Sequence, residues 1–384
     1  MVNDTITSTG LFDKFGTSAR EVCWTLAKSK IAESALLSGD EPVNRAILFF
    51  GGASPAENYS RYYDNLKEMI RGLQAKGIKS ENIIVMYADG LDPTPDQNVN
   101  PQSTVTVNSE MDFLREEGIA VVPATQNGLE NIFEALRPVL KDNDHTLFYA
   151  FDHGAQDVLG GTETLIGWNN EYIKDTDFAK IVDGLNGYKA YFFAECHSGG
   201  MIEDISIADG KTFVASATTA DEASFGGEEG YAGGFAKAIS KFESTHDLHK
   251  AAFAMDKYAD PTGFIPQILT PGQEVCVEHP QMRGAEFPVF YQPASASLLN
   301  SQNTDEIETD DLKAIVEYGC ANSFVYDNDT ADDNVLSETD YPDEEDITET
   351  DNSEAIAEYG DIIGVDTDDL LDNFDDTIDM DDNF

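Results

Sequence analysis

The stretch YFFAECHSGG (191–200) leads an apolar run directly into a cysteine, a histidine, a serine and two glycines. A short apolar run that ends in glycines is typical of a parallel strand buried on both faces. Cys196 follows this run, and the carboxyl ends of parallel strands are where open α/β sheets present their reactive side chains. The stretch therefore predicts a buried strand that ends in a nucleophile.

Similar apolar runs recur along the chain, with segments of helical periodicity between them. The strand-like runs are RAILFFGG (45–52), NIIVMYADG (82–90), HTLFYAFDHG (145–154) and KTFVASATTA (211–220), and FPVFYQP (287–293) is the candidate for a last strand. Helical spacing is found over 58–77, 128–140, 177–187 and 233–242, and DVLGGTETLIGW (157–168) is typical of a hairpin. This alternation predicts an α/β domain with a mostly parallel sheet and helices on both faces.

Changes of composition divide the chain into three parts. Residues 1–42 are predicted to form an extension with one helix, and 43–293 the compact domain. Within that domain, residues 91–123 are polar and rich in Pro and Asn, which predicts a surface insertion. Residues 294–384 are rich in Ser, Asn, Asp and Glu, which predicts a largely disordered tail.

Two short repeats interrupt the acidic tail. From Ser301 onward the chain has 30 acidic residues and one lysine, and the repeats are DDLKAIVEYG (310–319) and NSEAIAEYG (352–360). Each repeat offers an Ala-Ile pair and a tyrosine, so the repeats are candidates for docking on the compact domain or on another protein. The simpler alternative is a solvated tail without a regulatory role.

The charge of the whole chain limits its partners. The formal net charge is −50, which argues against nucleic acid and against an anionic membrane surface as partners. No apolar run is long enough to span a membrane, and the first residues lack the basic start and apolar segment of a secretion signal, so a cytoplasmic location is expected. The four cysteines form no close pair, so neither a disulfide framework nor a metal site is indicated and no cofactor is expected.

The ends of two predicted strands carry the groups that acyl transfer requires, a thiol and an imidazole. The strand over 145–154 ends in Asp152, His153 and Gly154, and if it neighbours the strand before Cys196, imidazole and thiol meet at one sheet edge. An imidazole activates a thiol as a nucleophile, and the Gly154 and Cys196 N–H groups are then candidates to stabilise an oxyanion. The alternative is a small buried cysteine without catalytic function.

These motifs resemble the legumain (asparaginyl endopeptidase) family of caspase-like cysteine peptidases. The resemblance rests on FYAFDHG, YFFAECHSGG and VASATTADEAS (214–224), and it extends over about residues 44–245 in the order of that family. The CHSG piece is similar to metacaspases as well. The resemblance implies a caspase-like three-layer sandwich with a mostly parallel six-stranded sheet.

The resemblance also implies roles for individual residues. Cys196 corresponds to the nucleophile, His153 to the catalytic histidine, and Gly154 to the oxyanion hole. Asn58 corresponds to the asparagine that orients the histidine. The positions implied to bind substrate are Arg61, Ser224, Glu195 and Asp152.

Substrate specificity is where the sequence departs from legumain. The pocket arginine is displaced by one position, to Arg61, and the acids of the family's S1 pocket are replaced by Ala194 and Gly234. Such a pocket is not expected to bind Arg or Lys, whereas an inward Arg61 favours an acidic or amide side chain at P1. We therefore expect a protein or peptide substrate, cleaved after Asn or Asp, and possible cleavage sites within the chain's own tail. The alternative is a binding protein with a vestigial Cys–His pair that acts through its acidic tail.

Overall fold

The computed structural model describes residues 19–92, 94–99, 106–109, 111–156, 162–259 and 278–292. The chain divides into two compact units, Met1–Ser323 and Phe324–Phe384, and every described residue belongs to the first. The predicted acidic tail and both of its repeats lie outside the described residues. In the described part, no helix is both long and apolar enough to cross a membrane.

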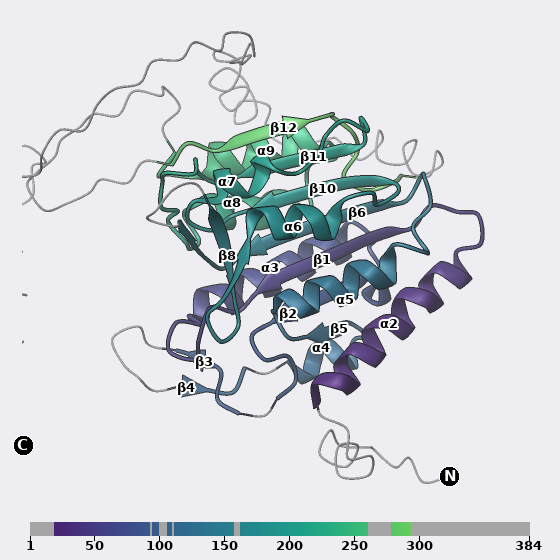
Figure 1. Ribbon diagram of the computed structural model, residues 1–384, viewed down its shortest axis with the longest axis horizontal. Coiled ribbons are helices and arrows are strands. Elements are labelled where there is room, and N and C mark those ends of the chain that lie inside the picture. Colours follow the sequence, from purple (N-terminus) through teal and green to yellow (C-terminus); the bar gives the residue numbers. More distant parts are fainter. Residues whose placement is uncertain are drawn as a thin grey trace, which may run out of the picture. The chain divides into compact units, whose positions relative to one another are not determined.

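A seven-stranded sheet forms the centre of the domain (Figure 1). Its strands follow the order β12-β11-β10-β6-β1-β2-β5, in which all pairs are parallel except the antiparallel pair of β11 and β12. The parallel strands are β1 (Asn44–Phe50), β2 (Ile83–Tyr87), β5 (Ala120–Val122), β6 (His145–Phe151), β10 (Tyr188–Phe193) and β11 (Thr212–Ser216), and β12 spans Gln281–Gly284. The predicted mostly parallel sheet is thus confirmed, although it has seven strands where six were expected.

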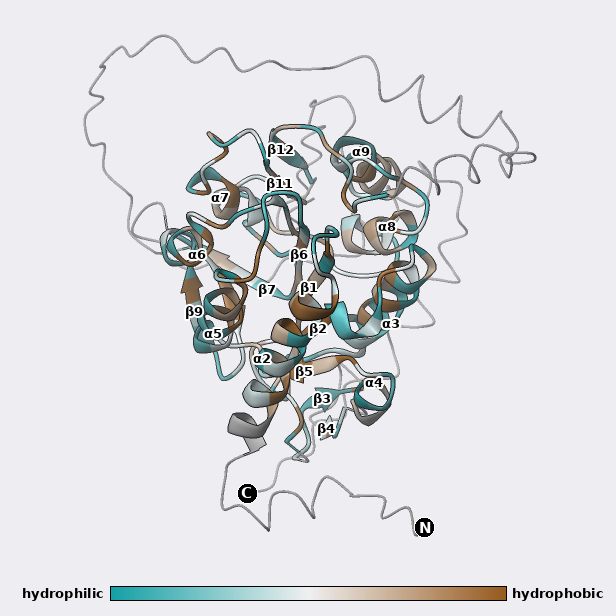
Figure 2. Cartoon of the chain, turned by 90° about the vertical axis from the view of Figure 1, so that its right-hand side faces the viewer, coloured by the Kyte–Doolittle hydropathy of each residue, from teal (hydrophilic) through white to brown (hydrophobic). Residues whose placement is uncertain are grey.

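Helices cover both faces of the sheet (Figure 2). One face holds α3 (Ser60–Ala75), α4 (Asp112–Glu116), α8 (Tyr231–Ala238) and α9 (Thr245–Met255), and the other holds α2 (Ala19–Leu37), α5 (Gln126–Leu136), α6 (Asp175–Val182) and α7 (Ser198–Glu203). Along β1, Leu48 and Phe50 face the first layer, and Ile47 and Phe49 face the second. Successive side chains of a strand point to opposite faces, so this uninterrupted apolar run serves two cores.

The first helix is part of the second core. Trp24, Ala27 and Ile31 of α2 are buried with residues of β5 and α5. The predicted helix of the N-terminal segment therefore exists and packs against the edge of the sheet. Helix α3 ends as predicted, because Gly77 follows it with φ +81°, a left-handed conformation that glycine adopts without strain.

The two edge strands differ from the sequence-based predictions. The last strand is β12, and not the apolar run over 287–293, whose Phe287, Val289 and Phe290 fill the first core without forming a strand. At the other edge, β5 lies within the segment predicted as a surface insertion. A short edge strand carries little apolar periodicity, whereas an irregular segment that plugs a core is strongly apolar, and this explains both errors.

Two small antiparallel sheets flank the main one. The predicted hairpin is present, but its first arm is β7 (His153–Gln156), paired with β8 (Glu163–Gly167), which in turn pairs with β9 (Glu171–Lys174). The second small sheet pairs β3 (Gln97–Asn98) with β4 (Thr106–Val107). His153 therefore stands where the chain leaves β6 and turns into a hairpin.

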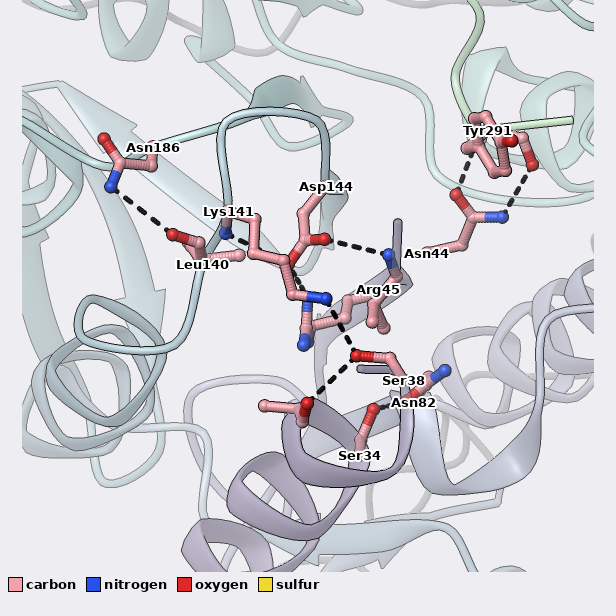
Figure 3. A network of polar contacts seen from close by, with 12 residues as sticks. Ser34, Ser38, Asn44, Arg45, Asn82, Leu140, Lys141, Asp144, Asn186 and Tyr291 are labelled. Atoms are coloured by element: carbon pink, nitrogen blue, oxygen red, sulfur yellow. Dashed lines mark hydrogen bonds and ion pairs between the residues drawn. The ribbon is translucent and has the colours of Figure 1, made fainter. Parts of the chain in front are cut away.

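A buried ion pair joins β1 and β6 at their amino ends (Figure 3). Arg45 is 2% exposed and its Nη1 lies 2.8 Å from Asp144 Oδ2, while Asp144 Oδ1 accepts a hydrogen bond of 2.9 Å from the N–H of Val43. Lys141 also donates its main-chain N–H to Asp144, and its Nζ lies 3.0 Å from Ser38 Oγ at the end of α2. The pair lies at the amino ends of the strands, whereas Cys196 follows the carboxyl end of β10. The ion pair therefore stabilises the fold and takes no part in the candidate active site.

Candidate active site

Cys196 lies just beyond the carboxyl end of β10. The strand pairing continues to Ala194, whose N–H donates to Ala150 O at 2.9 Å, so β6 and β10 end side by side. His197 then adopts a left-handed conformation (φ 61°), and α7 begins at Ser198. The thiol is partly exposed, and burial raises its pKa above the usual value for cysteine.

The Cys196 thiol is held by the main chain of Ser224. The Ser224 N–H donates to Sγ at 3.2 Å, and Sγ lies 3.6 Å from Ser224 O. The next turn is fixed in the same way, because His197 N–H donates to Glu222 O at 2.7 Å and His197 Nδ1 lies 2.8 Å from Ala220 O. The segment after β11 therefore runs along Cys196, where the sequence placed the substrate-binding Ser224.

His153 is positioned by aromatic rings and by one carbonyl group. Its ring meets those of Tyr59 and Tyr62 edge to face, with centroid distances of 5.9 and 5.5 Å. Nε2 lies 3.1 Å from Glu57 O. A carbonyl oxygen only accepts, so Nε2 carries the hydrogen and Nδ1 keeps its lone pair. Burial lowers the pKa of His153, which favours this neutral form.

Gly154 brings the histidine and cysteine segments into contact. A Cβ on this residue would overlap the main-chain oxygen of Cys196 and lie 2.8 Å from Cγ of Glu195. Only glycine permits this approach of the two backbones. In the described residues no hydrogen bond joins the His153 ring to the thiol; such bonds are often long in a free enzyme and shorten when substrate binds.

Asn58 is buried, and its side chain bonds residues other than His153. Nδ2 donates to Asp96 O at 2.8 Å, and Oδ1 accepts from the Tyr87 hydroxyl at 3.1 Å. The segment at β3 adds a further contact, because Asn98 N–H donates to Asn58 O at 2.8 Å. The direct partner of the His153 ring is thus the carbonyl of Glu57, one residue earlier, on a loop that Asn58 anchors.

Two acids with buried carboxyl groups flank the reactive pair. Asp152 accepts the N–H of His153 at 2.8 Å through Oδ1, while its Oδ2 finds no partner among the described residues. Glu195 is 1% exposed, and neither of its carboxyl oxygens accepts a hydrogen bond from the part of the chain that the structure describes. Burial raises the pKa of both groups well above the usual range, which favours their neutral forms. Glu195 is enclosed by the protein and not open to a substrate.

Arg61 lies beside the histidine. Its guanidinium stacks over the Tyr59 and Tyr62 rings, with Cζ at 4.4 and 4.9 Å from their centroids. Nη2 donates to the Tyr62 hydroxyl at 3.2 Å, and a Cβ on Gly226 would lie 3.0 Å from Nε. Burial is the main cause of the raised pKa of Cys196 and of the lowered pKa of His153, and the Arg61 charge acts on both groups as a smaller influence. The one-residue displacement in sequence therefore leaves this arginine close to Cys196 and His153.

No pattern in the sequence predicts three of the groups at the site. They are the carbonyl of Glu57 and the carboxyl groups of Glu278 and Asp256. Glu278 accepts from Ser224 Oγ at 3.2 Å and from the N–H of Phe225. It is 54 residues away from Ser224 in a segment without a recognisable motif, so only the fold reveals the contact.

Comparison with known proteins now identifies the family. The profile of the peptidase C13 family matches residues 46–241, slightly more than half of the chain. The chain belongs to the peptidase C13 family. This confirms the resemblance to legumain, and the matched segment contains both His153 and Cys196.

Two plant relatives support this C13 assignment. A vacuolar-processing enzyme of Ricinus communis is 26% identical over 224 residues, which cover 52% of this chain and 42% of the relative. The vacuolar-processing enzyme beta-isozyme of Arabidopsis thaliana is 26% identical over 199 residues, which cover 47% of this chain and 39% of the relative. The chain thus spans about two fifths of the length of these curated relatives.

Proposed function

We propose that this protein is a cysteine endopeptidase that cleaves peptide bonds with Cys196 as nucleophile and His153 as acid and base. The observation that carries the proposal is the contact between Gly154 and the main chain of Cys196, which holds the two strand ends together at one edge of the sheet. Family membership supports the same reaction class. The substrate is a protein or peptide, and the reaction requires no cofactor.

The proposed reaction uses the neutral forms of both groups. His153 Nδ1 accepts the thiol proton while Sγ attacks the scissile carbonyl carbon, and the N–H groups of Gly154 and Cys196 stabilise the resulting oxyanion. The imidazolium then gives its proton to the leaving amine, and a thioester remains on Cys196. Water attacks the thioester with His153 as base, which releases the carboxylic acid product and restores the thiol.

Arg61 supports cleavage after Asn or Asp. Its guanidinium lies near the reactive pair, and a planar cation with several N–H donors suits a carboxylate or amide oxygen. The tail contains many Asp and Asn residues, so cleavage within the tail is part of the proposal.

The alternative function is a binding protein that keeps the peptidase fold and acts through its acidic tail. What favours the enzyme is that the groups of the proposed reaction are present: a partly exposed thiol, an imidazole whose Nδ1 has no hydrogen-bond partner among the described residues, and a glycine at the oxyanion position. A vestigial site has no physical reason to retain all three.

Two substitutions and one label test the proposal. Cys196→Ala and His153→Ala should each lower kcat/KM by several orders of magnitude without unfolding the chain, because both side chains lie at strand ends outside the cores. An acyl chloromethyl ketone should label the wild type and leave Cys196→Ala unlabelled. Cys23→Ala is the matched control, since that thiol is buried in the second core with its pKa raised to about 11. Retention of more than about a tenth of the activity in either variant would refute the assignment.

A further inference from the structure

Glu278 is an acid buried next to the candidate nucleophile. The residue is 0% exposed, and a single oxygen, Oε1, accepts hydrogen bonds from Ser224 Oγ and from the N–H of Phe225. These two residues form the segment whose main chain holds the Cys196 thiol. One carboxyl oxygen therefore fixes the segment that touches Sγ.

Glu278 lies next to another buried acid, Asp256. The two carboxyl groups lie close enough for each to influence the pKa of the other, and Asp256 is 5% exposed. Neither Glu278 Oε2 nor Asp256 Oδ2 finds a donor on any other described residue. Two carboxylates this close together in a buried site repel each other, so the pair favours a form in which the two groups share one proton.

Both acids are also linked to the Phe225 side chain, through Tyr258. Asp256 Oδ1 accepts the N–H of Tyr258 at 2.9 Å, and Glu278 N–H donates to Tyr258 O at 3.0 Å. The Tyr258 ring stacks on Phe225, with centroids 4.4 Å apart and planes 22° apart. Residues from the end of α9 and from the segment before β12 thus enclose Ser224 and Phe225 as one unit.

We propose that Glu278 is a positioning residue of the active site, which holds Ser224 and Phe225 against Cys196 only while it shares a proton with Asp256. The inference rests on the proposed peptidase function. The Asp256–Glu278 pair acts on the reaction through Ser224 and Phe225, which border the Cys196 thiol, and neither acid touches the substrate's scissile bond.

The proton makes this arrangement sensitive to pH. Burial raises the pKa of both acids, and of Glu278 well above its usual range, so the pair keeps its proton at neutral pH. Across the packed elements the pair faces Tyr231 of α8 and the Cys196 thiol, while the adjacent His279 pairs with Glu222. Loss of the proton places a second negative charge in a buried site, which repels its partner and disfavours the Cys196 thiolate.

The Glu278→Gln variant tests the shared proton. Glutamine reproduces the protonated pair at every pH, because its oxygen accepts from Ser224 and Phe225 and its NH₂ donates to Asp256. We expect kcat/KM within about threefold of the wild type at neutral pH, whereas Glu278→Ala loses at least about tenfold. Profiles from about pH 6 to about pH 10 should show an alkaline decline in the wild type that is absent or shifted upward in Glu278→Gln.

Two further variants and the shape of the pH profile decide between support for the proposal and its rejection. Asp256→Asn should behave like Glu278→Gln, and Glu286→Gln, an exposed acid in the same part of the chain, should leave the profile unchanged. An alkaline limb that is identical in the wild type and in Glu278→Gln would overturn the inference, even if Glu278→Ala fails to fold. Failure of the peptidase assignment is a separate result, since it appears as cleavage or active-site labelling that persists in Cys196→Ala.

Discussion

Gly154 lies so close to the main-chain oxygen of Cys196 that a β-carbon would overlap it. The two residues are 42 positions apart, and each follows the carboxyl end of one of two neighbouring strands, β6 and β10. The contact lets the chain turn into β7 next to the main chain of Cys196. His153 is thereby carried to the sheet edge that presents the thiol.

Gly154→Ala should damage both the site and the fold. The new methyl group must displace the Cys196 main chain or the Glu195 side chain, since Cγ of the latter would be only 2.8 Å away. We expect a loss of at least about tenfold in kcat and a free energy of unfolding lower by about 1–3 kcal/mol, typical of overpacking. Peptide cleavage and denaturant unfolding measure the two effects.

Gly77→Ala is the matched control for this substitution. Gly77 has open space around its Cα but a φ of +81°, so alanine there adds backbone strain of about 1 kcal/mol and no clash. The control should lose stability and keep its kcat. If both glycine variants keep full kcat, the close approach at Cys196 has no catalytic importance.

The sequence predicted that the strand ends at His153 and Cys196 meet at one sheet edge, because two local signals coincide there. Apolar runs that end in DHG and ECHSGG are readable as strand ends, and parallel strands place such ends at one edge. Their adjacency was an assumption at that stage, and the pairing of Phe193 with Ala150 supplies it. Gly154 and Cys196 were therefore within reach of sequence reasoning.

The contacts that fix these residues were not predictable in the same way. The His153 ring bonds the main-chain oxygen of Glu57. Every residue has a main-chain carbonyl, so the residue type at this position gives no indication of the contact. Glu278 reaches Ser224 only because β12 folds back antiparallel on β11. Short edge strands such as β12 and β5 carry weak periodicity, so sequence patterns miss both the strands and the contacts that depend on them.

Arg61→Ala should change the specificity of cleavage more than its rate. If the guanidinium binds the P1 side chain, its loss raises KM for Asp or Asn at P1 by about tenfold or more, and leaves small apolar P1 residues little affected. A peptide library that varies only P1 measures this. Arg71→Ala is the control, since Arg71 is on the same helix and exposed. A uniform loss over all P1 side chains would make Arg61 a structural residue that supports Tyr59 and Tyr62.

Glu195→Gln should stabilise the fold in a pH-dependent manner. Because the pKa of Glu195 is raised by burial, the folded chain keeps a proton that the unfolded chain releases above about pH 4. Stability contributed by this group is thus full at low pH and falls by about 1.4 kcal/mol per pH unit until the raised pKa is passed. Glutamine removes that fall. The variant should gain free energy of unfolding at about pH 7 and little at about pH 4.

Thermal or denaturant unfolding at the two pH values checks this expectation. Glu228→Gln supplies the control, because the Glu228 side chain is 83% exposed. An equal stability change at both pH values would show that Glu195 is charged in the folded protein. The buried carboxyl would then need a partner beyond the described residues.

Removal of the chain after about residue 295 should yield a folded enzyme that is active at once. The described residues end at Gln292, and the N–H and carbonyl of Tyr291 both bond the Asn44 side chain at the start of β1, so truncation after about residue 295 leaves every described contact in place. The removed part carries 30 acidic residues and both Ala-Ile repeats, and we expect it to restrain the site in the full chain. Full-length protein should therefore show a lag that coincides with cleavage of the tail, whereas the truncated form shows none. In Cys196→Ala the tail should stay intact, which separates self-processing from a contaminating protease. Equal initial rates in the two forms would leave the tail a solubilising role only, and an unfolded truncation would place the domain boundary further along the chain.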